Sequence, residues 1–394
     1  MAITLTSTMD ASVAALYEKD FLEQKRKTSV WAQEGLVNWK YALGGANLRG
    51  SSIQVPMIEE MDIATTALTE SSDVTPVALS DRYITLSFYE YGNAVQHTRM
   101  LDLENYADQG KMAAFAVAQN QARSLDRLVR NAAVGGTWVA YAIGCGTRTD
   151  LDATNDIMVF QDLYTAVAQA KNASVPEFDG GFVAIANPMV LAGLAADTAW
   201  QALSEYSRPE QMLNGEIGKW AGVRFISHEY GKLYLGGGAS TVATTLGAAL
   251  TAGDTTATIT TTSFAANKYV TIGTLEAANT EQVFCTAIGT GTIAFRGEGN
   301  TATNFGCRYA HDSGAAVTYA ANAGAVLLLG RNSLFGAYAK DIGKDGRLTV
   351  EWAQTTIPKR FLNHAWYWIG GFTRNEHALL RLEVACPEGI LGDN

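Results

Sequence analysis

Residues 51–92 read SSIQVPMIEEMDIATTALTESSDVTPVALSDRYITLSFYEYG, and this stretch decides the fold. Its two ends alternate between apolar and polar residues, a pattern typical of half-buried β-strands. The apolar faces of the two runs carry Ile53, Val55 and Met57, and Ile84, Leu86 and Phe88. The alternation predicts two strands that pair as an extended hairpin within residues 51–97.

A long acidic loop joins the two predicted strands. Its carboxylates are Glu59, Glu60, Asp62, Glu70, Asp73 and Asp81. A compact domain rarely keeps a loop of this length without a use for it, and a two-stranded arm is too thin to bury itself. We therefore expect the arm to lie on a neighbouring molecule, in a protein that contacts copies of itself. Glu59 and Glu60 are not expected to act as an acid/base pair, because adjacent residues of a strand point to opposite faces.

A long helix is predicted from Asp102 to Val134, with Asp102 as its N-cap and Gly135-Gly136 as its stop. Gly110 predicts a first turn that is kinked or late. An apolar stripe runs along the helix through Met112, Phe115, Ala118, Ala122, Leu125, Val129 and Ala132. A mostly basic stripe lies beside it and comprises Asn120, Arg123, Arg127 and Arg130. We interpret the basic stripe as solvated or paired with carboxylates rather than bound to phosphate.

Composition divides the rest of the chain. From Leu235 to Ala323 there is no Trp or Pro, and short Thr-rich, β-prone runs recur between Gly, Asn and Asp turns, which predicts a small all-β domain. Both residue types return after it. The predicted segments are an N-terminal arm with one helix after Asp10 (1–50), the hairpin loop (51–97), the long helix and a central domain (98–234), the inserted all-β domain (235–323) and C-terminal strands that complete the central domain (324–394).

The central domain is predicted to mix helices and strands. We expect a helix over 159–172, a strand over 182–188, a helix that begins at Pro188 and a strand over 223–227. Four C-terminal runs, AVLLLG, GRLTVEW, HAWYWIGGF and ALLRLEV, are expected in one mixed sheet that packs against the long helix. Trp366 and Trp368 share one face of their strand, with Tyr367 and Ile369 on the other.

Length and charge limit the classes of function that the chain can have. At 394 residues the chain has room for two or three domains, and its charged fraction of 17% is low, as in subunit contact surfaces. The net charge of −10 argues against a sequence-reading DNA binder but allows a wall that encloses DNA. The first residues lack the pattern of a signal peptide, and no apolar run is long enough to predict a membrane span. We expect a protein made in a reducing cytoplasm.

No catalytic, cofactor-binding or metal-binding constellation is predicted. Gly289–Ala294 resembles a fragment of a dinucleotide fingerprint without its helix, and Asp150–Asp156 lacks the Gly and Glu of a calcium loop, so we favour an ordinary turn. Asn172 would be a glycosylation site only in a secreted protein. The histidines are scattered and are interpreted as structural: His97, His228, His311, His364 and His377. The cysteines form no CxxC pair and are interpreted as reduced: Cys145, Cys285, Cys307 and Cys386. The sequence leaves open whether Cys285 and Cys307 pair.

Several motifs in fixed order carry a family resemblance. They are ATTALTESSDVTP (64–76), YGNAVQHTRML (91–101), LDRLVRN (125–131), ANPMVLAGLAADTAW (186–200) and NGEIGKWAGVRFI (214–226). Their marks are Leu68, Glu70 and Pro76, then Tyr91-Gly92, then Gly215–Gly218 and Gly222–Phe225. The chain resembles the major capsid protein of tailed bacteriophages, and more narrowly the coat-protein family of the large-virion-polymerase podophages. Ser71 stands where that family usually has Gly.

The resemblance covers roughly residues 10–230 and 324–385. It implies an α+β fold with an N-arm, an extended β-hairpin loop, a long spine helix, peripheral and axial domains and an inserted small all-β domain. It further implies a non-enzymatic virion protein, made in the bacterial cytoplasm, whose hexamers and pentamers form an icosahedral shell around double-stranded DNA. Scaffolding, portal and decoration proteins are the further partners that it implies, with no membrane.

The inserted segment resembles a small β module that recurs in phage virion proteins. The residues that carry this likeness are Glu281, Arg296-Gly297, Thr301, His311, Gly314 and Val317. The likeness implies a module on the outer surface that binds a neighbour, a decoration protein or a cell-surface glycan. Two alternatives stay open: a surface or tail protein that recognises host glycans through this module, and a virion-associated hydrolase that uses His311 and Ser313.

Overall fold

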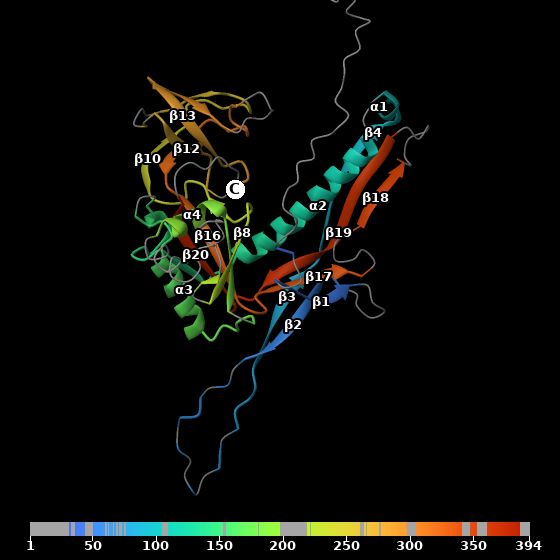
Figure 1. Cartoon of the computed structure of the whole chain (residues 1–394), viewed down its shortest axis with the longest axis vertical. Helices are drawn as coiled ribbons and strands as arrows, with labels where there is room; N and C mark the ends of the chain where they lie inside the picture. Colours follow the sequence, from blue (N-terminus) through green and yellow to red (C-terminus); the bar gives the residue numbers. More distant parts are fainter. Residues whose placement is uncertain are drawn as a thin grey trace, which may run out of the picture.

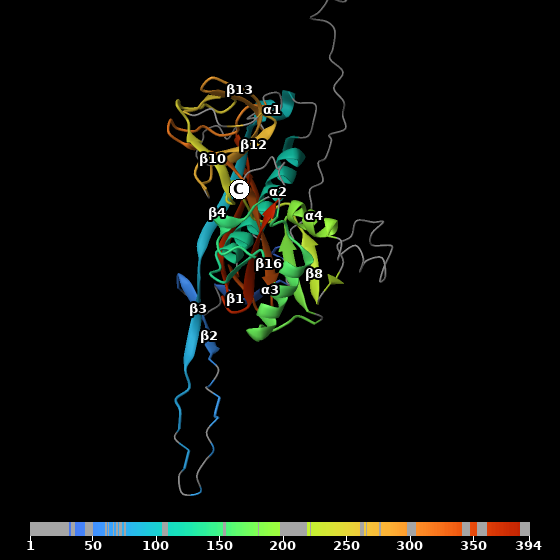
Figure 2. The ribbon, with the colours of Figure 1, turned by 90° about the vertical axis from the view of Figure 1, so that its left-hand side faces the viewer.

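The computed structural model describes residues 31–32, 36–43, 50–59, part of 61–80, 81–104, 109–152, 155–179, 181–197, 219–220, 222–260, 264, 266–275, 277–297, 305–340, 347–352 and 361–386. The helix predicted after Asp10 lies outside these residues. The described chain forms three sheets and one separate hairpin. The hairpin and the six-stranded sheet lie at opposite ends of the long axis (Figures 1 and 2).

The predicted hairpin is confirmed. β2 (Ser52–Ile58) and β3 (Asp81–Ser87) pair antiparallel, with Ile58 opposite Asp81. The second predicted strand is in fact two strands. The chain leaves the hairpin at Phe88 and enters β4 (Tyr89–Thr98), which pairs with β19 in a different sheet. The alternation continues through both strands and gives no sign of this change of partner.

A five-stranded sheet forms the lobe beside the hairpin. Its strands are β1 (Val37–Leu43), β17 (Leu334–Ala339), β19 (Phe361–Arg374), β18 (Arg347–Trp352) and β4. The long strand β19 pairs with β4, β17 and β18, all antiparallel. Gly92 of β4 lies close to β19, where an added Cβ would meet the carbonyl oxygen of Trp366 at 2.8 Å.

The long helix is confirmed, but its start is wrong. Two helices occupy the region, α1 (Arg99–Glu104) and α2 (Gln109–Val134). The hydroxyl of Thr98 accepts a hydrogen bond from the Leu101 backbone N–H at 3.2 Å, as an N-cap does, so the helical segment begins before the predicted cap Asp102. α2 begins one residue before Gly110 and ends at Val134, immediately before Gly135-Gly136 as expected.

The face of α2 that packs on β19 follows the predicted stripe only in part. Leu125 and Val129 are buried, whereas Phe115 is 39% exposed. Val117, outside the predicted stripe, is buried with Leu125 against Trp366 and Trp368. The indole N–H of Trp366 donates to the Asn120 side-chain oxygen at 2.8 Å.

A seven-stranded sheet holds the largest core. Its strands are β5 (Val139–Tyr141), β20 (Leu379–Cys386), β16 (Asn322–Leu329), β6 (Phe182–Ala186), β8 (Val223–Ser227), β7 (Lys219–Trp220) and β9 (Leu233–Tyr234). The short helix η3 (Arg148–Asp150) follows β5, and α3 (Phe160–Asn172) and α4 (Pro188–Ala196) match the two predicted helices.

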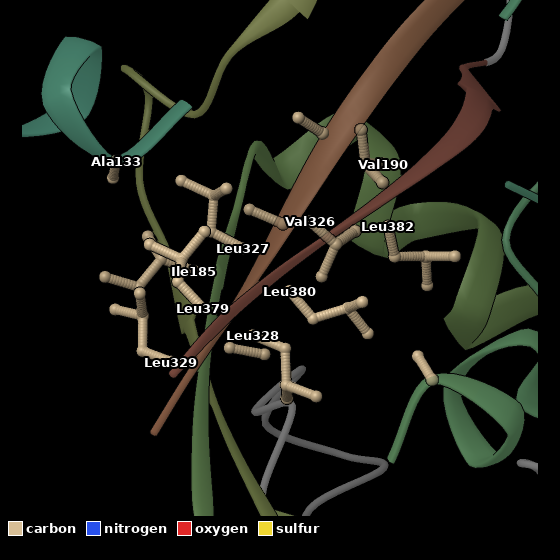
Figure 3. Close-up of a cluster of buried hydrophobic side chains, with 14 of the residues drawn as sticks. Ala133, Ile185, Val190, Val326, Leu327, Leu328, Leu329, Leu379, Leu380 and Leu382 are labelled. Carbon is tan, nitrogen blue, oxygen red and sulfur yellow. The ribbon is translucent and has the colours of Figure 1, made fainter. Parts of the chain in front are cut away.

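Every residue of β16 is buried because both faces of the sheet are covered. Figure 3 shows Leu327 and Leu329 on the side of Ala133 from the end of α2, and Val326 on the side of Val190 from α4. The side chain of Asn187 caps α4 by accepting from the Met189 backbone N–H at 2.9 Å. The last turns of the long helix therefore join the core of this sheet to the neighbouring lobe.

The expectation of one C-terminal mixed sheet is wrong. AVLLLG and ALLRLEV lie in β16 and β20 of the seven-stranded sheet, whereas GRLTVEW and HAWYWIGGF lie in β18 and β19 of the five-stranded sheet. The residues themselves explain the division. β16 is buried throughout and β20 is buried at every residue except Arg381, as in strands that are covered on both faces. β19 instead alternates between buried Trp366 and Trp368 and the 37% exposed Tyr367.

A six-stranded antiparallel sheet lies within residues 240–320. Its order is β10 (Ser240–Thr245), β15 (Ala316–Ala320), β12 (Lys268–Ile272), β13 (Glu281–Gly289), β14 (Thr292–Arg296) and β11 (Thr256–Thr258). Val270, Ile272, Val283 and Ile293 are among the residues of its separate hydrophobic core. The all-β character predicted for this segment is therefore confirmed in its described residues.

Two chain segments connect this sheet to the rest, and they run side by side. The Gly238 N–H donates to the Ala321 carbonyl at 2.8 Å, and the Ala321 N–H donates to the Ala239 carbonyl at 3.0 Å. Buried Asn322 and Gln282 exchange amide hydrogen bonds of 2.8 and 3.0 Å. The Asn322 side-chain oxygen also accepts from the Gly236 N–H at 3.0 Å, so the junction is satisfied internally.

Trp368→Ala tests the packing of β19 on α2. Trp368 is 0% exposed, so the truncation leaves a cavity, and we expect the free energy of unfolding to fall by about 3–5 kcal/mol in urea denaturation of the unassembled chain. The matched control is Tyr367→Ala on the opposite face of the same strand, which should change stability by much less. Equal losses for the two variants would contradict the packing.

Candidate functional site: the extended hairpin and its supports

The outer part of the hairpin exposes apolar side chains that nothing in the described chain covers. These side chains are Ile58 (72% exposed), Met61 (58%), Ile63 (87%), Val74 (58%), Val77 (66%) and Leu79 (62%). Exposed acids lie among them: Glu59, Glu70, Asp73 and Asp81. Two hydrogen bonds join Glu59 and Ser80 across the hairpin: the Ser80 hydroxyl donates to Glu59 Oε2 at 3.0 Å, and the Glu59 N–H donates to the Ser80 carbonyl at 3.1 Å. The limb therefore presents a mixed apolar and acidic surface to its surroundings.

The base of the hairpin is anchored on the five-stranded sheet. Val55 and Leu86 are 5% and 1% exposed and pack with Phe335 and Ala337 of β17. Gly371 of β19 lies so close to the end of β3 that an added Cβ would meet the Ser87 carbonyl oxygen at 1.9 Å. The hairpin is thus held firmly at one end while its outer part leaves the body (Figure 2).

A second exposed apolar surface surrounds α1 at the far end of the same lobe (Figure 1). Its members are Val95 (43% exposed), Met100 (62%), Leu101 (44%), Leu103 (76%) and Phe115 (39%). Large exposed apolar side chains that gather in one region of a protein are candidates for an interaction site. The sequence did not predict this surface: the long helix was expected to begin at Asp102, whereas α1 begins at Arg99 and is separate from α2.

A buried carboxylate holds the start of the described chain against α2. Asp126 is 1% exposed, and its Oδ1 accepts hydrogen bonds from the backbone N–H groups of Trp31 and Ala32 at 3.1 and 3.2 Å. His228 Nε2 lies 3.8 Å from its other oxygen. The ring of Trp31 is fully buried. α2 therefore fixes the point from which the N-terminal segment departs.

The predicted basic stripe faces the chain rather than solvent. The guanidinium groups of Arg123 and Arg127 each lie 5.5 Å from the centre of the Tyr230 ring, and Arg123 donates to the Tyr230 hydroxyl. Arg130 is 6% exposed and donates to the Tyr230 carbonyl at 3.4 Å. The stripe joins the long helix to the segment that follows β8, so its arginines have a structural role.

His311 and Ser313 do not form a nucleophile–base pair. His311 Nε2 lies 2.9 Å from Glu281 Oε1 in a buried position, while the Ser313 hydroxyl donates to the Gly247 carbonyl at 3.3 Å. Glu281 also accepts from the backbone N–H groups of Arg308 and Tyr309, at 2.8 and 3.1 Å. A serine nucleophile needs a base within hydrogen-bond reach, so this constellation ties a loop to β13 and has no catalytic geometry.

In the acidic segment that begins at Asp150, the carboxylate of Asp150 binds backbone and hydroxyl groups of its own turn. Asp150 Oδ2 accepts from the Thr147 hydroxyl and backbone N–H and from the Gly146 N–H, at 2.9, 2.9 and 3.2 Å. These hydrogen bonds, from Thr147 first, lower the pKa of Asp150. Among the residues that the structure describes, no group of three His, Cys, Asp or Glu side chains is placed to hold a metal ion.

The other residues considered as site candidates from the sequence lie in different parts of the fold. Gly289–Ala294 spans the tight turn between β13 and β14. His97 and His364 stack, with ring centres 5.2 Å apart, where β4 pairs with β19. All four cysteines are free thiols, Cys285 and Cys307 included. Within the described part of the chain, no helix has the length and apolar character needed to cross a membrane.

Comparison with known proteins gives a likeness of fold. No protein-family model matches the chain, and no curated protein sequence does. Among solved structures, the capsid of cyanophage Pam1 aligns with a TM-score of 0.61 at 13% identity, covering 97% of this chain and 98% of that one. The capsid of Ralstonia phage GP4 aligns with a TM-score of 0.59 at 12% identity over 100% of both chains. That of Helicobacter pylori bacteriophage KHP30 gives 0.58 at 9% identity, covering 98% and 99%.

The protein therefore has the fold of phage capsid proteins, and the fold-level expectation from the sequence is confirmed. The aligned region spans nearly the whole of each chain, so the likeness is not confined to one domain.

Alkylation of Cys145 tests the environment of the loop after β5. Burial, followed by a hydrogen bond to Asp156, raises the pKa of this partly exposed thiol to about 11. Because the thiolate is the reactive form, we expect iodoacetamide at pH 8 to modify Cys145 at least about tenfold more slowly in the native chain than in urea. Peptide mass spectrometry measures both rates, and a native rate equal to that in urea would contradict the raised pKa.

Proposed function

We propose that this protein is the major capsid protein of a tailed bacteriophage and assembles into the icosahedral shell of the head. Its fold, shared over almost the full chain with capsid proteins of several phages, supports this function. The absence of a nucleophile–base pair at His311 and Ser313 agrees with a structural rather than enzymatic role.

The observation that carries the proposal is the exposed outer hairpin. An isolated two-stranded limb is marginally stable in water, and this one presents Ile63 and Val77 at 87% and 66% exposure. Covering such side chains against another subunit removes about 25 cal/mol of unfavourable free energy for each Å² of apolar surface. A sister copy supplies the same cover at every position of a closed shell, and many weak contacts then add up.

The apolar surface around α1 offers a second contact. It lies at the end of the lobe away from the hairpin (Figure 1), so one subunit can meet different neighbours through its two surfaces. Separate contact surfaces on one chain are what a closed assembly of many copies requires. Hexamers and pentamers are the arrangement that we propose.

Further features of the proposal concern family, partners and location. We place the chain with the coat proteins related to those of the large-virion-polymerase podophages, carrying an inserted virion-type β module at 235–323. The shell encloses double-stranded DNA without reading its sequence, in keeping with the net charge of −10. Synthesis in the bacterial cytoplasm and contacts with scaffolding, portal and decoration proteins complete the proposed function.

Shortening the hairpin tests the proposal. The Glu59 N–H donates to the Ser80 carbonyl at 3.1 Å, so residues 60–79 can be replaced by an Asn-Gly turn that keeps the strand register. We expect a folded, soluble chain that no longer forms shells in negative-stain electron microscopy. The double variant Ile63→Glu and Val77→Glu should act in the same direction, because it places charge in the buried contact.

The matched control is Tyr164→Glu on α3, which changes an apolar side chain of similar exposure, 60%, far from the hairpin. It should leave assembly intact. Normal shells from the shortened chain would overturn the role of the hairpin, and a wild-type protein that never exceeds a few chains would overturn the capsid function itself.

One observation favours a second function, that of a surface or tail protein that recognises host glycans. The six-stranded sheet lies away from the hairpin and has its own core, so it is placed to meet an external ligand (Figures 1 and 2). Glycan binding by a wild-type chain that stays monomeric or trimeric on a sizing column would favour this alternative over a shell.

A further inference from the structure

Four flat side chains form a row across one face of the six-stranded sheet. Tyr269 of β12 lies opposite Phe284 of β13, and Phe284 lies opposite Arg296 of β14. Phe305 continues the row from the segment after β14, because its ring lies beside the guanidinium group of Arg296. The Gly297 N–H, which donates to the Phe305 carbonyl at 2.7 Å, holds this segment next to β14. Adjacent strands are about 4.8 Å apart, so the row is about 14 Å long.

The row lies on the face away from the core of this sheet. Val270, Val283 and Phe295, the strand neighbours of Tyr269, Phe284 and Arg296, are buried in the core. Because successive side chains of a strand point to opposite faces, the row points outward. Tyr269 and Phe284 are partly exposed, and Phe305 is 50% exposed.

The rings and the guanidinium group contact one another within the chain itself. The Tyr269 and Phe284 ring centres are 5.1 Å apart in an edge-to-face arrangement. The Arg296 guanidinium carbon lies 4.5 Å from the centre of the Phe305 ring. Such contacts stabilise an exposed arginine in one place, so less conformational freedom is lost when a ligand binds.

Arg296 brings an exposed positive charge to the row. The structure shows no carboxylate of the described residues in a salt bridge with it. A guanidinium group presents N–H donors in a plane and matches a carboxylate with two parallel hydrogen bonds. The row therefore combines apolar ring surface with a site for one anionic group.

We propose that this row, Tyr269–Phe284–Arg296–Phe305, binds a carboxylate-bearing glycan strand. The C–H faces of successive sugar rings lie on the aromatic side chains, and a sugar carboxylate pairs with Arg296. The strand spacing is comparable to the length of one pyranose unit, so consecutive units of a polysaccharide meet consecutive members of the row. The proposed shell function is not required for this inference.

Two other ligand classes fit the row less well. A single-stranded nucleic acid also stacks on aromatic rings, but its channel carries many cations along the backbone, and this chain has a net charge of −10. A protein partner usually anchors a large side chain in a pocket, whereas this row lies across the face of a sheet. A linear, ring-built chain with intermittent negative charge matches the row best.

Binding of defined oligosaccharides to the full-length chain tests the proposal. The probes are hexagalacturonate, its neutral methyl ester and the oligonucleotide dT20, each measured by isothermal titration calorimetry. We expect hexagalacturonate to bind more tightly than its methyl ester. Arg296→Gln should weaken hexagalacturonate binding about tenfold and bring it close to that of the ester, and Phe305→Ala should weaken both sugars.

The matched control removes a positive charge from the opposite face of the same sheet. Lys268 lies opposite Cys285 and 5.5 Å from the Tyr319 ring, away from the row, so Lys268→Gln should leave sugar affinity unchanged. The proposal is overturned if hexagalacturonate does not bind, if Lys268→Gln weakens binding as much as Arg296→Gln, or if dT20 binds in a manner that depends on Arg296. Electron microscopy of the same samples reports shell formation separately, so failure of one function is distinguishable from failure of the other.

Discussion

The hairpin beyond the Ile58–Asp81 pair cannot bury its own apolar side chains, and much of the structure can be understood from this constraint. Two strands have no second layer to cover them, so Ile63 and Val77 stay exposed unless another molecule supplies that layer. The chain instead fixes the base, where Val55 and Leu86 pack on β17. Because the outer part of the hairpin cannot bury its apolar side chains by folding, the hydrophobic effect favours their burial against another molecule.

The base of the hairpin rests on a lobe that the long helix supports. The lobe that carries it is stiffened by α2, which packs along β19 through Val117 and Leu125 and ends in the core of the seven-stranded sheet. Asp126, buried on the same helix, holds the N-terminal segment. The helix α2 therefore contacts three parts of the chain: the sheet that supports the hairpin, the segment at Trp31 and the core of the seven-stranded sheet.

Sequence patterns predicted the elements well and their partners less well. Alternation located β2 and β3, and periodicity located α2 to its last residue, because both signals are local. The change of sheet at Phe88 and the separation of β16 and β20 from β18 and β19 depend on contacts distant in sequence, and alternation is the same on either side. The packing of the basic stripe on Tyr230 and the apolar surface around α1 were not predicted for the same reason, because the exposure of a residue depends on what packs over it.

The junction of the six-stranded sheet has a consequence for how such a chain changes over time. Its entering and leaving segments are hydrogen-bonded to each other at Ala239 and Ala321, and the Asn322–Gln282 amide pair seals the contact. Because the two segments already lie next to each other, a short loop can join them in place of the six-stranded sheet. Closing so short a loop costs little conformational entropy. Removal or replacement of residues 240–320 at this junction would therefore leave the pairing of the five- and seven-stranded sheets unchanged.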